Sequence, residues 1–106
     1  MVAYLGKADL FPLLAAFPEA VRDVKDVARE ATDLRLVSGV KNFERILSLR
    51  RLRRLWCFKL NEKSLAVLIH CTSLERLYVD GLRYENLDAL TRLRGLIVLS
   101  VILRQG

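Results

Sequence analysis

The stretch Leu52-Arg53-Arg54-Leu55-Trp56-Cys57-Phe58 decides the fold of this chain of 106 residues. Its apolar positions alternate with polar or aromatic ones, a pattern typical of a β-strand with one buried face. The pattern returns 22 residues later at residues 74–80, and once more at residues 96–102. A fixed period of this length indicates a chain built from repeated units, each packed on the next.

Columns of equivalent residues keep this 22-residue spacing. A polar column, Asn42, Ser64 and Asn86, holds residue types that accept a hydrogen bond from free amide groups at a helix start. We therefore expect helices at residues 42–49, 64–71 and 86–93, alternating with the strands. The six apolar columns are Leu52, Leu74 and Leu96; Leu55, Leu77 and Leu99; Cys57, Val79 and Val101; Leu65 and Leu87; Leu68 and Leu90; and Cys71 and Leu93.

Two parts of the chain depart from the period. A less regular strand at residues 34–37 is offset by 21 residues, which predicts a bulge or altered turn at residues 38–40. Residues 1–31 do not fit the repeat. Apolar residues spaced for a helix over residues 18–31, with a shorter helix over residues 8–16, predict an N-terminal helical cap that seals the first repeat within one compact domain. The spaced apolar residues are Phe17, Val21, Val24, Ala28 and Ala31.

The Leu-x-x-Leu-x-(Val/Cys) units resemble the leucine-rich repeat family over residues 32–106. The resemblance implies an α/β solenoid with a parallel sheet on its concave face and helices on its convex face. It also implies a non-enzymatic module for protein–protein interaction. Where the family carries a loop-tying Asn or Cys, this chain has Leu60, Leu82 and Arg104. We expect the turn backbone to be satisfied in another way.

The resemblance also predicts a binding surface. Side chains between the leucines point out from the concave face in this family, and here they include the Arg, Trp and Tyr that dominate binding hot spots. We expect a protein partner with an acidic surface. The alternative is that the cap or a neighbouring loop folds over these aromatics. The predicted partner-binding residues are Arg35, Arg54, Trp56, Phe58, Arg76 and Tyr78.

The net charge of +6 is unevenly distributed. Residues 1–33 carry 4 basic and 6 acidic side chains, whereas residues 34–106 carry 14 basic and 6 acidic ones. Guanidinium groups bind phosphates or carboxylates, and adjacent aromatics stack on bases, so nucleic acid or another polyanion is a second candidate partner. The alternative is a solvated edge that keeps the protein soluble. The basic run is Arg50, Arg51, Arg53 and Arg54.

A third hypothesis concerns the last strand, which is apolar on both faces. Such an exposed edge favours pairing, so we expect either a homodimer through this C-terminal strand or a further repeat downstream.

Composition and motifs favour a binding protein in the cytoplasm over an enzyme. Hydrophobic residues make up 53% and charged residues 28%, which excludes a disordered linker. The N-terminus lacks a secretory signal pattern, and no apolar run is long enough for a membrane helix. His70 with Cys71 supplies two metal ligands where structural zinc requires four, and Cys57 and Cys71 match core positions. We therefore expect no metal, no cofactor and no catalytic residues.

Overall fold

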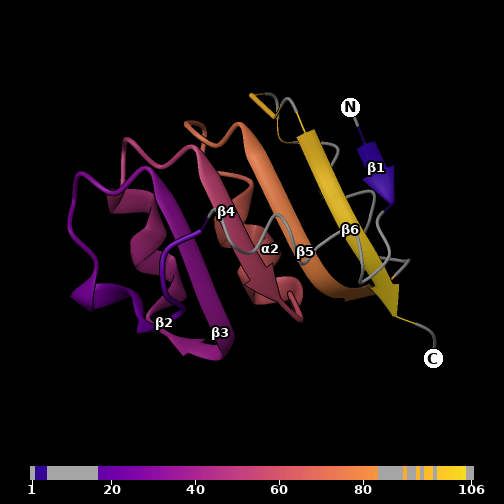
Figure 1. The fold of residues 1–106 in the computed structure, drawn as a ribbon, viewed down its shortest axis with the longest axis horizontal. Coiled ribbons are helices and arrows are strands. Elements are labelled where there is room, and N and C mark those ends of the chain that lie inside the picture. Colours follow the sequence, from indigo (N-terminus) through magenta and orange to yellow (C-terminus); the bar gives the residue numbers. More distant parts are fainter. Residues whose placement is uncertain are drawn as a thin grey trace.

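The computed structural model describes residues 2–4, 17–83, 90, 93, 95–96 and 98–104. The protein is a small α/β protein with a parallel sheet of strand order β1-β6-β5-β4-β3-β2 (Figure 1). The elements in chain order are β1 (Val2–Tyr4), β2 (Val21–Asp23), the 3-10 helix η1 (Val24–Asp26), β3 (Asp33–Lys41), the 3-10 helix η2 (Phe43–Ser48), β4 (Arg54–Phe58), α2 (Glu62–Leu68), β5 (Arg76–Arg83) and β6 (Val98–Arg104).

The predicted 22-residue period is the step between neighbouring strands. Arg54 of β4 pairs with Arg76 of β5, which pairs with Val98 of β6. The strands of these units begin two residues later than the sequence pattern indicates. Leu52 and Leu74, which precede them, are nevertheless buried. Parallel pairing in a constant register therefore places equivalent residues of successive units side by side.

The irregular first strand is also confirmed. Leu34 pairs with Leu55, a step of 21 residues. On its other side β3 pairs with β2 only at Val21 and Asp23, and the register shifts between these two residues. Gly39, within the predicted irregular stretch, has a φ of 75°, a conformation that costs a glycine little.

The hydrophobic core lies between the sheet and the helical segments on one of its faces. Leu55 and Leu77 point to this face and are fully buried, as are Ile46 of η2 and Leu68 of α2. Their burial explains the spacing of the apolar columns, because each unit covers the aliphatic side chains of the next.

The helical segments differ from the sequence expectation in start and type. Asn42 precedes η2, but it has a φ of 58° and its side chain donates to Asp23 instead of capping the helix. Ser64 does not begin a helix either. The side chain of Asn61 accepts from the Ser64 amide at 2.8 Å, so α2 begins earlier than predicted. The predicted helix at residues 86–93 lies largely outside the described residues.

The turn after β4 shows what replaces the loop-tying polar residue. Leu60 is buried and joins the hydrophobic core. The amide of Lys59, a residue with a φ of 47°, donates to the carbonyl oxygen of Asp80 at 3.0 Å. The turn is thus held by apolar burial and by one more backbone hydrogen bond between neighbouring units.

The predicted helix over residues 18–31 is wrong. This stretch contains β2 and one turn of 3-10 helix, η1, whose start is capped by the Asp23 side chain. Val24 is buried, whereas Ala28 is exposed. Pairing with the open edge of β3 satisfies backbone groups that a helix would leave unpaired, and it overrides the helical spacing. The shorter helix predicted over residues 8–16 lies outside the described residues.

The edge of β6 is not open over its whole length. β1 pairs with it in parallel, with Val2 opposite Leu99 and Tyr4 opposite Val101. The open edge on which the dimer hypothesis rested is therefore already occupied at these positions by the chain's own N-terminus. Residues 1–31 contribute a strand to each edge of the sheet.

We expect Leu77→Ala to lower the free energy of unfolding by about 2–5 kcal/mol, because it leaves a cavity at the buried centre of the sheet. Urea denaturation followed by the fluorescence of Trp56 measures the change. Leu47→Ala is the matched control: this leucine is 42% exposed, and its removal should change stability by no more than about 0.5 kcal/mol. Equal losses in the two variants would contradict the assigned core.

Candidate binding surfaces

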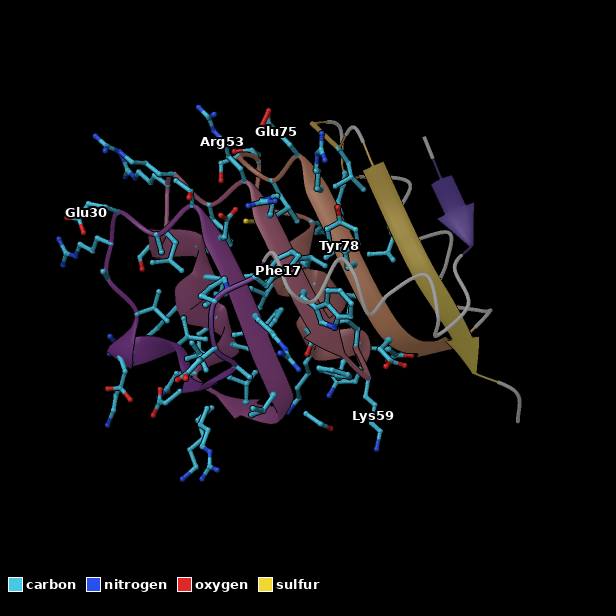
Figure 2. The ribbon with its side chains drawn as sticks, viewed as in Figure 1. Phe17, Glu30, Arg53, Lys59, Glu75 and Tyr78 are labelled. Atoms are coloured by element: carbon cyan, nitrogen blue, oxygen red, sulfur yellow. The ribbon has the colours of Figure 1, made fainter. Side chains whose placement is uncertain are left out.

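Three aromatic side chains form a cluster on the sheet face opposite the helices. Trp56 and Tyr78 are neighbours in register, and their rings stack with centroids 5.7 Å apart. Phe17 lies over both rings in edge-on contact, at 5.6 Å from Trp56 and 5.5 Å from Tyr78 (Figure 2). Edge-to-face and offset-stacked geometries are the favourable ones for aromatic rings. We call Phe17, Trp56 and Tyr78 the aromatic cluster.

The expectation that Trp56 and Tyr78 are exposed is wrong. Only 1% of Trp56 and 4% of Tyr78 is accessible, because the N-terminal part of the chain covers this face at Phe17. The alternative, in which a neighbouring segment folds over the aromatics, describes the structure. Phe17 was the available signal, but its assignment to a helical stripe concealed its contact with the sheet.

Arg54 is engaged within the protein. Its Nε and Nη2 donate to the two carboxylate oxygens of Asp33 at 2.6 and 2.7 Å, and its guanidinium carbon lies 5.4 Å from the centre of the Phe17 ring. The hydrogen bond from Arg54 lowers the pKa of Asp33, and the same bond raises the pKa of Arg54. A two-pronged ion pair of this kind fixes the side chain, so Arg54 orders the aromatic cluster.

The other predicted partner-binding residues are not gathered in one patch. Arg35 is half-buried beside Trp56, and its Nε atom is buried without a hydrogen-bond partner among the described residues. Phe58 is half-buried at the opposite end of β4 from Arg54. Arg76 is exposed at the start of β5.

The loops before β3, β4 and β5 form the second surface. Because parallel strands begin at one edge of a sheet, these loops lie together there. They enclose a groove of about 670 Å³, and an adjoining one of about 300 Å³ shares Thr32, Arg53 and Glu75 with it. We call this surface the basic edge. The larger groove is lined by Thr32, Arg50, Arg51, Arg53, Ser73 and Glu75, and the smaller adds Asp33, Arg54 and Arg76.

The predicted basic run is thus divided between the two grooves. Arg50, Arg51 and Arg53 are exposed around the larger one, while Arg54 is held by Asp33. Arg53 approaches Glu75 only to 3.9 Å, and Figure 2 shows both near this end of the sheet with Lys59 near the other. Sequence reasoning missed Glu75 and placed Arg76 elsewhere. The 22-residue step that relates Arg53 to Glu75 was the signal that joins them.

The two cysteines lie in the core, as their columns indicate. Burial raises the pKa of both thiols, which keeps them protonated and unreactive. Within the described ranges, no group of three or more His, Cys, Asp or Glu side chains is arranged to hold a metal ion. In the same part of the chain, no helix combines the length and apolar character required to cross a membrane.

Comparison of the chain with protein-family models, with curated proteins and with solved structures gives no match.

We expect Asp33→Asn to cost about 1 kcal/mol of stability at pH 7, because it removes the ion pair with Arg54. The pKa of Asp33 is lowered from 3.8, so its contribution is present above that value and is lost as the pH falls through the lower pKa of the folded state. Urea denaturation of both proteins at pH 7 and at pH 2.5 should show the difference shrinking in acid.

Asp26→Asn is the control for this prediction. Asp26 is exposed and forms no ion pair with another described residue, so its substitution should cost less at pH 7. An undiminished difference between wild type and Asp33→Asn at pH 2.5 would contradict the role given to the ion pair.

Proposed function

We propose that this chain is a non-enzymatic binding module of the leucine-rich-repeat type that acts in the cytoplasm. The 22-residue period and the constant parallel register support the assignment, together with helical segments on one face of the sheet. The partner is an acidic segment of another protein, and it binds along the basic edge. The contact surface is then displaced from the predicted concave aromatics to the amino ends of the strands.

The charge balance of the basic edge carries this proposal. Five arginines and two carboxylates line the two grooves, a net charge of +3. Only one arginine, Arg54, is close to a carboxylate among these residues, since Arg53 and Glu75 are 3.9 Å apart and exposed. Free guanidinium groups around a concave surface favour carboxylates and accelerate association with a negatively charged partner.

The burial of the aromatic cluster favours protein over nucleic acid. Binding of single strands combines a basic groove with aromatic side chains on which bases stack. Trp56 and Tyr78, the aromatics adjacent in sequence or in register to the basic run, are covered by Phe17. The basic edge therefore offers charge without a stacking platform, which suits a flexible acidic peptide.

A decaglutamate peptide with a fluorescent label tests the proposal. Arg50→Gln/Arg51→Gln should bind it about tenfold more weakly than wild type at low salt, because two of the exposed cations are removed. Fluorescence anisotropy measures the dissociation constants. Lys59→Gln/Lys63→Gln removes the same charge from the opposite end of the sheet and should bind like wild type.

Equal weakening in the two double variants would mean that net charge alone governs binding, and would refute the assigned groove. A single-stranded oligonucleotide with the same number of charges serves as the competitor. If it binds more tightly than the peptide, the acidic-protein assignment is wrong and the polyanion hypothesis takes its place.

A further inference from the structure

Two buried donors on the aromatic face lack acceptors. The Nε1 atom of Trp56 and the Nε atom of Arg35 are both inaccessible to solvent, and neither has a hydrogen-bond partner within the described part of the chain. Trp56 as a whole is 1% exposed. A buried donor without an acceptor costs about 1–3 kcal/mol, and more when the group is charged. Two such donors in one small area indicate a site that lacks its matching group.

The two donors lie on neighbouring strands. Arg35 of β3 is the direct partner of Trp56 of β4, so both side chains leave the same face of the sheet from adjacent positions. Neighbouring strands are about 4.8 Å apart, which is within the span of one carboxylate or carbonyl group. On the next strand Tyr78 continues the row, and its ring stacks on Trp56. Donors and an aromatic platform therefore stand side by side.

Phe17 occupies the platform but leaves the donors unmatched. Its ring contacts Trp56 and Tyr78, and the guanidinium group of Arg54. These contacts hold only the ring. Pro18, Glu19 and Ala20 are exposed, and no backbone hydrogen bond joins them to another described residue. Phe17 thus fills the aromatic half of a site whose polar half has no occupant among the residues described.

We propose that the row of Arg35, Trp56 and Tyr78 is a binding site for a protein segment that carries an aromatic side chain next to a carboxylate. The aromatic ring takes the place of Phe17 on Trp56 and Tyr78. The carboxylate accepts from Arg35 and from the indole of Trp56. Phe17 is then an intramolecular competitor, which a partner must displace. This site is separate from the basic edge, and the proposal stands whether or not that edge binds an acidic segment.

A carboxylate suits the donors better than a neutral acceptor. It has acceptor oxygens only, and it can accept from the indole and the guanidinium at once. Its charge also balances Arg35, whose side chain forms no ion pair with another described residue. Hydrogen bonds between ionised partners are about twice as strong as those between neutral ones.

The test uses the peptide acetyl-Ala-Ala-Phe-Asp-Ala-amide and the intrinsic fluorescence of Trp56, the only tryptophan in the chain. Phe17→Ala removes the competitor, so the full-length variant should bind the peptide about tenfold more tightly than wild type. Circular dichroism verifies that the variant is folded. Phe17→Leu, which keeps an apolar side chain without the ring, is the second variant and should show a smaller gain.

Two matched peptides separate the halves of the site. Replacement of Asp by Asn in the peptide should weaken binding about tenfold, since the acceptor loses its charge, and replacement of Phe by Ala should abolish the fluorescence change. Arg35→Met in the Phe17→Ala background should remove the preference for Asp over Asn. Arg76→Met in that background is the control, because Arg76 is exposed, and it should keep the preference.

Equal affinity of wild type, Phe17→Ala and Phe17→Leu for the peptide would overturn the proposal, because Phe17 would not be competing for the site. Equal affinity of the Asp and Asn peptides would overturn the assignment of the two donors to a carboxylate. The peptide carries a single charge, so its binding should depend weakly on salt, unlike that of decaglutamate at the basic edge. Failure of one site thus leaves the other testable.

Discussion

The parallel register that sets Leu34 beside Leu55, and Leu55 beside Leu77, is the constraint on which the rest of the structure depends. It aligns the aliphatic side chains into one buried layer against Ile46 and Leu68. The same alignment brings the loops before β3, β4 and β5 to one edge, where the arginines gather. A shift of one residue would exchange the two faces of a strand, burying Trp56 among the leucines.

The second layer of the protein is formed by its own N-terminal part. The chain contributes β1 to one edge of the sheet and β2 to the other, and Phe17 between them packs on the aromatic face. The ion pair of Arg54 with Asp33 lies next to these rings and ties β4 to β3. Each aromatic pair adds about 0.5–1.5 kcal/mol beyond the area it buries, which is enough to hold a cover that a partner can still displace.

The sequence predicted the features that repeat and missed those that occur once. The columns through Leu55 and Leu77 gave the strands and their register, and the offset at Leu34 located the irregularity near Gly39, because a period averages over several units. Phe17 covering Trp56, and β1 pairing with β6, join residues far apart in sequence without any periodic signal. The apolar spacing in residues 18–31 indicated a helix, yet the open edge of β3 required a strand. Capping by Asn61 in place of Ser64 was equally local and equally hidden.

Interstrand nuclear Overhauser effects between β4 and β5 test the central claim most directly. In parallel strands the short contacts join amide and α protons of neighbouring residues in an evenly spaced series. The account predicts such a series, with Leu55 facing Leu77, Trp56 facing Tyr78 and Cys57 facing Val79. Close contacts between pairs of α protons on the two strands, the mark of antiparallel pairing, would contradict it, as would a series displaced by one residue.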